Sequence, residues 1–485
     1  MTGINSAWSG VGGDPALLTR VSTVTREGAL QARLPVRELA RACVGACALA
    51  AAELGARRAG LAEVPRVTLD DGAVATAFVS ERHLMVDGRA PVAFAPLSRF
   101  WPTADGWVRT HANYPHHRAR LAAALGVAEE EPDAVGAALA ERSSLEVEAA
   151  MYAAGGLAVA LRTPEEWAAH EQAVAVARRP LVEHERSDTV RARALPALDG
   201  TPLLPAAGVR VLDLTRVIAG PVATRTLALL GADVLRVDAP QLPELADQHT
   251  DTGFGKRSAT LDLAADRRAF EELLAAADVV VTGYRPGALD RFGLSARALA
   301  ERRPGLIVAE LSAWGSYGPW RERRGFDSLV QAATGIAAIE GATGATGATR
   351  ASTDGPAAVS SPGALPAQAL DHGTGYLLAA AVLRALSEQL GQGEGQGRCV
   401  RLALARTAEW LMNGIRPDPE GSLGDGVASS SDAYDSDNAP GIWLNERSSA
   451  LGRLRYALPP VSFAGGPGDW ARPPGVWGAD SARWV

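Results

Sequence analysis

The pattern of apolar and polar positions changes near the middle of the chain. From residue 208 onward, short apolar runs alternate with stretches whose apolar residues recur every three or four positions. Residues 208–238 contain the clearest case, with apolar runs at 209–214 and 234–237 and a leucine stripe between them. Nearly continuous apolar runs are typical of parallel strands buried on both faces. We therefore predict a strand–helix–strand unit with a right-handed crossover.

The same alternation continues toward the C-terminus. Strands that alternate with helices predict an α/β fold, with a doubly wound, mainly parallel, Rossmann-like sheet. Helical periodicity is seen at residues 270–276 and 376–390, and the further apolar runs are at residues 258–263, 279–281, 306–311 and 399–404.

The chain before residue 208 has a different character. Aromatic residues surround an Asp-Gly turn between residues 96 and 118, and helical stretches follow. One of these helices is opened by a capping box at residues 163–166. These features predict a second, smaller α+β domain.

An internal repeat indicates that the first part of the chain is related to the α/β domain. Residues 44–78 align with residues 374–411, and both read helix, loop, strand, helix. In this register Arg41 stands where Asp371 stands in the second copy. We therefore predict five segments. They are a degenerate N-terminal copy of part of the α/β domain at 1–95, the small α+β domain at 96–185, a linker at 186–207, the Rossmann-like domain at 208–415, and a flexible loop with a C-terminal arm at 416–485.

Composition narrows the class of partners. The chain has 485 residues, 47% of them hydrophobic, and a net charge of -7. An acidic balance argues against nucleic-acid binding, and the richest apolar segment, residues 42–54, is too short to span a bilayer. No N-terminal apolar run has a basic flank, and the three cysteines make no disulfide framework. We expect a cytoplasmic protein without nucleic-acid or membrane partners.

The loop at residues 218–223 is a candidate phosphate site. It opens a predicted helix, and backbone N–H groups at a helix N-terminus favour anions. Of the three glycines in the dinucleotide fingerprint it has only Gly220. An NAD(P) oxidoreductase with Asp238 as the ribose-binding acid is therefore disfavoured.

Two other features bear on candidate chemistry. Lys256 is the single lysine of the chain, which indicates that this position needs an ammonium and not a guanidinium. The clustered histidines lack the spacing of a ligand set, so we predict no metal site. They are His111, His116 and His117.

Asp371 is the candidate of greatest interest. It precedes the helical stretch at residues 376–390. An aspartate in this place commonly caps a helix. A carboxylate beside exposed N–H groups can also act as a nucleophile whose oxyanion is stabilised nearby. The residues alone leave both interpretations open.

Five segments resemble the family III CoA-transferases, the CaiB/BaiF group. This group includes L-carnitine CoA-transferase, formyl-CoA transferase and the α-methylacyl-CoA racemases. The segments occur in the family's order and are together specific. They are VLDLTRVIAGPVATRTLALLGADVLRVDAP, GKRSATLDL, ADVVVTGYRPGALDRFGL, ELSAWGSYGPWRERRGFDSLVQAATG and ALDHGTGYLLAAAVLRAL.

The resemblance implies a CoA-transferase, in which CoA is a co-substrate that passes from an acyl-CoA to a small carboxylic acid. It implies Asp371 as the catalytic residue, which takes the acyl group as a mixed anhydride and then CoA as an aspartyl thioester. It also implies a set of CoA contacts. These are Val217, Ala219, Lys256, Arg257, Tyr284, Arg285, Gly287 and Arg291.

Two departures from the family keep alternatives open. The racemases need a histidine in a Gly-His-Asp triplet, and the matching residue here is Phe326, which cannot exchange a proton. An acyl-CoA racemase or epimerase is therefore the disfavoured alternative. The small domain precedes the Rossmann-like domain, a permuted or fused order that also allows a CoA-binding but inactive subunit. Since family members form interlocked dimers, the resemblance implies a homodimer or an internal pseudo-dimer.

Overall fold

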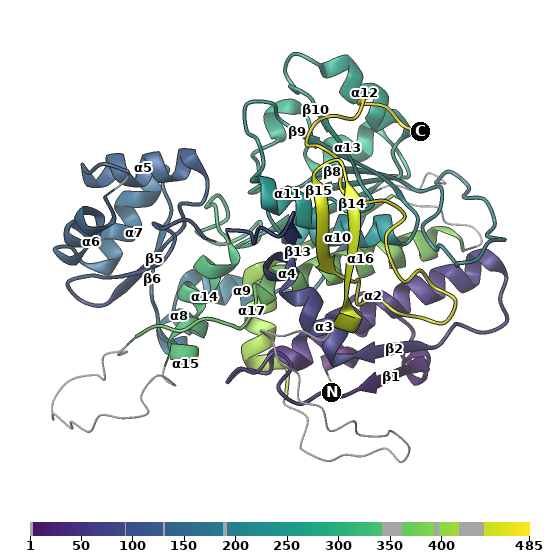
Figure 1. Cartoon of the computed structure of the whole chain (residues 1–485), viewed down its shortest axis with the longest axis horizontal. Helices are drawn as coiled ribbons and strands as arrows, with labels where there is room; N and C mark the ends of the chain where they lie inside the picture. The colour runs from purple at the N-terminus through teal and green to yellow at the C-terminus, as the bar shows by residue number, and fades with distance from the viewer. Residues whose placement is uncertain are drawn as a thin grey trace.

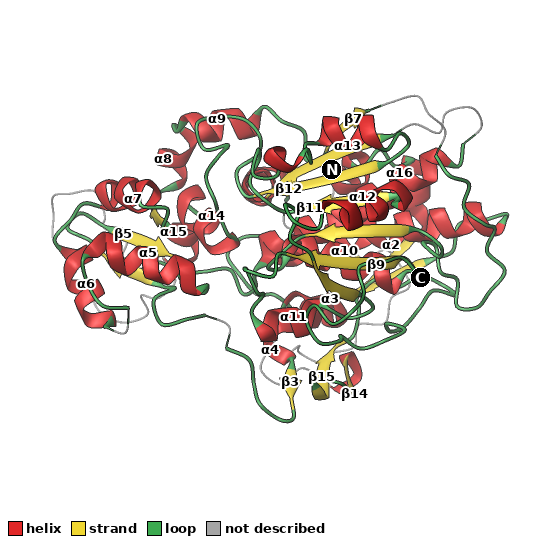
Figure 2. Cartoon of the chain, turned by 90° about the horizontal axis from the view of Figure 1, so that it is seen from above, coloured by secondary structure: helices red, strands yellow, loops and turns green. Residues whose placement is uncertain are grey.

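In the computed structural model, a seven-stranded sheet forms the centre of a large body (Figures 1 and 2). The strand order is β10-β9-β8-β11-β12-β13-β7; neighbours pair in parallel except that β7 pairs antiparallel with β13. This confirms the predicted mixed α/β, mainly parallel sheet. The strands are β7 (Glu183–Arg186), β8 (Arg210–Leu214), β9 (Asp233–Asp238), β10 (Arg257–Thr260), β11 (Val279–Thr282), β12 (Ile307–Ser312) and β13 (Arg398–Ala403).

The structure describes most of the chain. The predicted flexible loop after residue 416 lies mainly outside the described residues. The described ranges are 3–92, 94–129, 131–187, 192–341, 361–391, 397–416 and 441–485.

Helices cover both faces of the central sheet. Alternate residues of a strand point to opposite faces. Val279 and Val281 of β11 therefore join the core cluster that contains α10 and α16, while Val280 joins the cluster that contains α12 and α13. Burial on both faces explains the continuous apolar runs of these strands. The helices are α10 (Ala219–Leu229), α12 (Arg267–Ala276), α13 (Ala296–Arg302) and α16 (Ala369–Gln389).

Helix α2 (Val36–Ala59) packs along α16 in the core of the large body. Its 24 residues extend on both sides of the apolar segment 42–54, and by length and composition it could cross a membrane. In the structure, however, 94% of its most apolar window is buried inside the protein. Glu53 of α2 and Arg384 of α16 form a buried ion pair. Helix α2 is therefore a core helix.

The N-terminal elements follow the order that the internal repeat predicts. Helix α2 is followed by a strand and a helix, as α16 is followed by β13 and α17. Arg41, which aligns with Asp371, forms a buried ion pair with Asp71 at 2.5 Å. The remaining N-terminal elements are α1 (Gly3–Gly10), the 3-10 helix η1 (Pro15–Arg20), β1 (Val21–Val24), β2 (Val67–Asp70), α3 (Asp71–Phe78), α4 (Ser80–His83) and β3 (Met85–Val86), and α17 is Leu404–Glu409.

The smaller unit lies to one side of the large body (Figure 1). Its antiparallel sheet and covering helices enclose a core of their own around Trp101 and Val108. The predicted capping box is confirmed, since Thr163 and Glu166 cap α8 reciprocally. The elements of this unit are β4 (Phe100–Pro102), β5 (Trp107–Thr110), α5 (Pro115–Leu125), α6 (Pro132–Ala140), α7 (Ser144–Ala153) and β6 (Ala158–Ala160). The helices that follow, α8 (Pro164–Ala168) and α9 (Glu171–Ala177), bury Trp167, Ala173 and Val176 in the core of the large body instead.

The C-terminal region contains a hairpin that sequence reasoning missed. Strands β14 (Leu444–Ser449) and β15 (Gly452–Ala457) pair with each other, and β15 also pairs with β3. The mostly polar sequence of β14 gave no apolar run to find. The other elements are α11 (Ala246–Thr252), the 3-10 helix η2 (Asp290–Phe292), α14 (Asp327–Thr334), α15 (Ile336–Gly341), the π-helix η3 (Trp410–Gly414) and the 3-10 helix η4 (Gly441–Trp443).

The close contact between α16 and α10 yields a stability prediction. A Cβ atom on Gly375 would lie 2.5 Å from the carbonyl oxygen of Ala219, so the helices would have to separate. Gly375→Ala should therefore lower the free energy of unfolding by roughly 1–3 kcal/mol, measured by urea denaturation. Gly373→Ala is the matched control in the same helix, because its nearest neighbour is the Cys43 sulfur at 3.3 Å. Equal stability of the two variants would contradict the expectation.

Candidate active site

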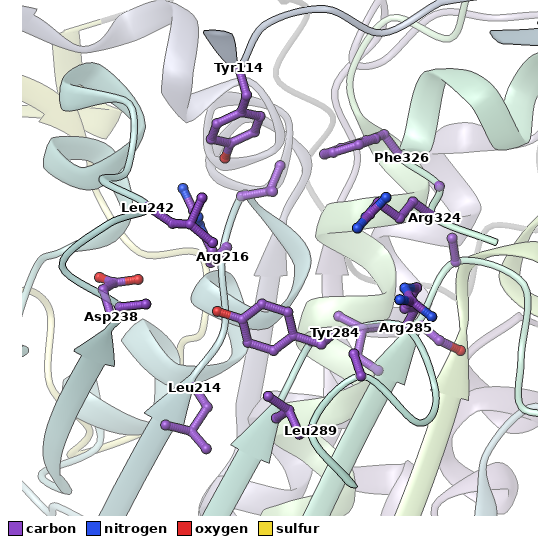
Figure 3. A pocket seen from close by; sticks show the side chains of 18 of the residues that line it. Tyr114, Leu214, Arg216, Asp238, Leu242, Tyr284, Arg285, Leu289, Arg324 and Phe326 are labelled. Carbon is purple, nitrogen blue, oxygen red and sulfur yellow. The ribbon is translucent and has the colours of Figure 1, made fainter. Parts of the chain in front are cut away.

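A cavity of about 610 Å³ lies at the carboxyl ends of β8, β9, β11 and β12 (Figure 3). Ligands of open parallel α/β sheets bind at this edge. The smaller unit completes the wall with three side chains, and one residue of α16 reaches the cavity. These four are Tyr114, His116, His117 and Asp371.

Most of the predicted site residues come together at this cavity. They reach it from the β8–α10 loop, from the segment after β11 and from α16. Two predicted contacts, Lys256 and Arg257, do not line the cavity. The residues that do are Val217, Ala219, Tyr284, Arg285, Gly287, Arg291 and Asp371.

Lys256 is buried in an ion pair behind the cavity. Its Nζ atom lies 3.0 Å from Oδ2 of Asp213 and donates to the carbonyl of Pro221, also at 3.0 Å. Burial lowers the pKa of Lys256 to about 8. The single lysine therefore ties β8 to the first turn of α10, and the prediction that it contacts a ligand does not fit the structure.

Arg257 also points away from the cavity. Its guanidinium contacts Asp233 at 2.8 Å and donates to the carbonyl oxygen of Arg483 at 2.5 Å. Arg257, like Lys256, is therefore not among the residues that the structure brings to the cavity. Lys256 directly precedes β10 and Arg257 begins it, and this position alone does not determine the direction of either side chain.

Asp371 does not cap its own helix. Helix α16 begins at Ala369, so Asp371 lies within the first turn. The capping carboxylate belongs to Asp327 of α14, whose Oδ2 accepts the N–H groups of Leu370 at 2.9 Å and Asp371 at 3.0 Å. The side chain of Asp371 is thereby left to face the cavity, where the residue is 5% exposed.

Acidic neighbours favour the protonated form of Asp371. Burial raises the pKa of Asp371 well above its usual value, and the negative charges of Asp327 and Glu81 raise it further. Asp327 keeps the charge more readily, since it also accepts a hydrogen bond from Gln331. Glu81 comes from α4 and contacts His372 at 3.3 Å. The N-terminal unit thus contributes to the electrostatics of the site.

Arginines give the rest of the cavity a positive character. Arg285 and Arg324 lie close together in Figure 3, with the ring of Tyr284 beside them. Burial lowers the pKa of Arg324, and the charges of Arg285 and Arg120 lower it further. Sequence reasoning missed Arg324. An anionic ligand would relieve the repulsion between these cations.

Burial lowers the pKa of each histidine that lies near the cavity, which favours the neutral imidazole. Burial, followed by the charge of His116, lowers the pKa of His117 to about 3. Phe326 lines the cavity with its ring stacked on His111 at 3.6 Å between centroids. Among the described residues, no group of three His, Cys, Asp or Glu side chains is arranged to hold a metal ion.

The β8–α10 loop is fixed by two buried carboxylates. Asp213 accepts the N–H of Thr215 at 2.9 Å, and Glu244 accepts the N–H of Val217 at 3.1 Å. Val217 has a φ of +70°, which is strained for a β-branched residue. Strain of this kind costs on the order of 1–3 kcal/mol and gathers at functional sites.

Asp238, the candidate ribose-binding acid, is already engaged. Arg236 contacts it at 2.7 Å, and the indole N–H of Trp477 donates to it at 2.9 Å. A dinucleotide ribose would have to displace these partners.

Residues 206–428 match the family model described as CoA-transferase family III. Similar proteins include an acetyl-coenzyme A transferase of Hypoxylon pulicicidum, 39% identical over 30% of this chain and 26% of that protein. A probable fatty acyl-CoA transferase of Mycobacterium tuberculosis is 36% identical over 44% of this chain and 53% of that protein. A formyl-CoA:oxalate CoA-transferase of Streptomyces avermitilis is 34% identical over 39% of this chain and 46% of that protein.

The chain spans between 26% and 53% of the length of these curated relatives. Among solved structures, a protein from Mycobacterium tuberculosis is 34% identical over 43% of this chain and 57% of that chain, with a TM-score of 0.36. A CAIB/BAIF family protein from Brucella suis is 24% identical over 51% of this chain and 65% of that chain, with a TM-score of 0.32.

The buried carboxyl group of Asp371 should destabilise the fold at neutral pH. Its folded-state pKa lies above the unfolded value, so this contribution favours the folded chain at low pH and is lost as pH rises through the raised pKa. Asp371→Asn should raise the free energy of unfolding at neutral pH by roughly 1–3 kcal/mol. The gain should shrink as pH falls toward the ordinary aspartate range.

Urea denaturation at several pH values measures the effect, with the exposed Asp199→Asn as the matched control. A variant of Asp371 that is less stable than the parent at every pH would contradict the electrostatic interpretation.

Proposed function

Because residues 206–428 carry the CoA-transferase family III region, we propose that this protein moves CoA from an acyl-CoA to a carboxylic acid through Asp371. One observation carries the proposal above the others. Asp371 is a buried carboxyl group on the wall of an arginine-lined cavity, inside the matched region. Such a cavity suits a ligand with a reactive carbonyl at one end and phosphates at the other.

The proposed reaction proceeds in balanced steps. The Asp371 carboxylate attacks the thioester carbonyl, the C–S bond breaks, and CoA leaves as a thiolate while the acyl group stays on Asp371 as a mixed anhydride. The thiolate attacks the aspartyl carbonyl and releases the donor carboxylate, which leaves an aspartyl-CoA thioester. The acceptor carboxylate then attacks the aspartyl carbonyl and expels the thiolate. Attack of the thiolate on the acceptor carbonyl forms the new acyl-CoA and restores Asp371.

The first turn of α16 does not supply the oxyanion donors that the sequence suggested. The N–H groups of Leu370 and Asp371 are already used by Asp327, and that of His372 donates to Gln368. The contribution of Asp327 is therefore to fix Asp371 and to add to the rise in its pKa that burial causes. Since a raised pKa makes the ionised carboxylate more basic, Asp371 is a stronger nucleophile at a pH where it has lost its proton.

We propose that the cavity arginines bind the phosphates of CoA, which acts as co-substrate. Arg285 and Arg291 line the cavity from the segment after β11, and Tyr284 offers an aromatic face for the adenine. Gly287 has a φ of +79°, which lets this segment turn back toward the cavity. Among the described residues, no carboxylate is recorded in an ion pair with Arg285, Arg291 or Arg324.

Several broader expectations also stay proposals. The doubly wound Rossmann-like arrangement is supported by the two core clusters on opposite faces of the sheet. An internal pseudo-dimer is supported by the matching order of α2–β2–α3 and α16–β13–α17. A cytoplasmic location is supported by three cysteines that are buried and free. A separate core that runs from Leu97 to Ala158 supports the assignment of a small domain within residues 96–185, although the last part of that range packs in the large core cluster.

Trapping the aspartyl intermediate tests the proposed chemistry. The protein incubated with acetyl-CoA should gain a hydroxylamine-sensitive acyl adduct at Asp371, detected by peptide mass spectrometry. Asp371→Ala should lose the adduct and at least about 10³-fold in turnover with a donor and acceptor panel, whereas Asp199→Asn should keep both. Full turnover in Asp371→Ala would exclude the mechanism. Solvent deuterium entering the α-carbon of a 2-methylacyl-CoA would favour a racemase, and binding of CoA without turnover would favour an inactive subunit.

The proposed phosphate contacts predict a charge-dependent affinity for CoA. Arg291→Ala should weaken CoA binding by about 10-fold to 100-fold and reduce its sensitivity to salt, because a charge-assisted contact is lost. Arg268→Ala is the matched control, since Arg268 is exposed and paired with Glu272. Isothermal titration calorimetry at two salt concentrations measures both effects. Equal losses in the two variants would point to nonspecific attraction instead.

A further inference from the structure

The loop between β8 and α10 forms part of the cavity wall in a conformation that its sequence disfavours. Val217 lies in the left-handed region, where its branched side chain is sterically unfavourable. Backbone of this kind persists only when surrounding contacts hold it. The contacts that hold Val217 therefore help to determine the shape of the cavity.

Of the two buried carboxylates that fix this loop, Glu244 is the one that binds Val217 itself. Glu244 accepts the N–H of Val217 on Oε2 and does not itself line the cavity. Arg236 contacts the same oxygen at 2.9 Å, and Arg216 contacts Oε1 at 3.4 Å. Although burial raises the pKa of Glu244, these two cations lower it to about 2. Glu244 is therefore a charged acceptor throughout the physiological range.

The same carboxylate also binds the smaller unit. The hydroxyl of Tyr114 donates to Oε1 of Glu244 at 2.5 Å, across 130 residues of sequence. The ring of Tyr114 lines the cavity, and the guanidinium of Arg216 lies 4.9 Å from its centroid. Figure 3 shows Tyr114 and Arg216 on the same side of the cavity. A single side chain thus joins the smaller unit to the strained loop.

We propose that Glu244 and Tyr114 are positioning residues for the CoA thioester site. Together they hold Val217 in its left-handed conformation, so that the loop keeps the shape that admits the ligand while the smaller unit is docked. Neither residue takes part in bond making. The inference rests on the proposed function for the identity of the ligand, but the restraint of Val217 stands on the contacts alone.

A double-mutant cycle separates positioning from direct contact with the ligand. Tyr114→Phe removes one hydroxyl and should weaken binding of CoA by about tenfold, as the loss of a hydrogen bond to a charged group does. In a Val217→Gly background the same change should weaken binding by less than about twofold, because glycine adopts the left-handed conformation freely. Tyr456→Phe is the matched control, since its hydroxyl donates to Asp469 at 2.6 Å in the C-terminal hairpin. Calorimetry with CoA measures each affinity.

Hydrogen–deuterium exchange of peptides covering residues 215–220 gives a second readout without ligand. Exchange should be faster in Tyr114→Phe than in the parent, and unchanged in Tyr456→Phe. Unchanged exchange in Tyr114→Phe would overturn the inference, as would a tenfold loss of affinity in both backgrounds, since Tyr114 would then act by touching the ligand. A parent protein that binds no CoA would overturn the proposed function instead. The exchange experiment would still decide whether Tyr114 restrains Val217.

Discussion

The contact between the Asp327 carboxylate and the first turn of α16 is the interaction on which the candidate site depends. It accepts two backbone N–H groups at a helix N-terminus, where negative charge is stabilised. Because this cap comes from another helix, the backbone of Asp371 is fixed while its side chain is free to face the cavity. Burial raises the pKa of Asp371, and the charge that fixes its backbone raises it further. Asp327 therefore contributes both to the position and to the basicity of the candidate nucleophile.

The cavity is assembled by buried carboxylates that each serve the backbone. Asp213 and Glu244 restrain the β8–α10 loop, as Asp327 restrains α16. Each of these carboxylates contacts a cation or accepts a side-chain hydrogen bond, and this contact offsets the free-energy cost of burying its charge. The smaller unit contributes Tyr114, which donates to Glu244, and the N-terminal unit contributes Glu81, whose charge raises the pKa of Asp371 beyond the effect of burial. The region of the mainly parallel sheet alone does not contain all the groups that shape the cavity.

The sequence predicts local structure here better than it predicts partners. Strands β8 and β11 are recognisable because burial on both faces demands continuous apolar runs. The place of Asp371 before a helical stretch makes it a candidate, and the family resemblance adds the catalytic role as an implication. The sequence does not predict the burial of Lys256, because its position in the chain carries no information on the direction of its side chain. Asp327 caps a residue 44 positions away, and no local pattern reports such a pairing. The polar strand β14 was missed because its pairing depends on its neighbours and not on an apolar face.

The last residues of the chain have a consequence for the outer strands of the sheet. Residues 477–480 run along β10, where Ala479 bridges Ala259 and Asp480 exchanges hydrogen bonds with Ser258. At the opposite edge, β7 is short and its sequence EHER is polar throughout, with two glutamates and one arginine. In the described part of the chain, one edge is thus occupied and the other is unattractive to a partner strand. By covering β10, the tail disfavours self-association through pairing of edge strands, to which an exposed strand at the edge of a sheet is prone.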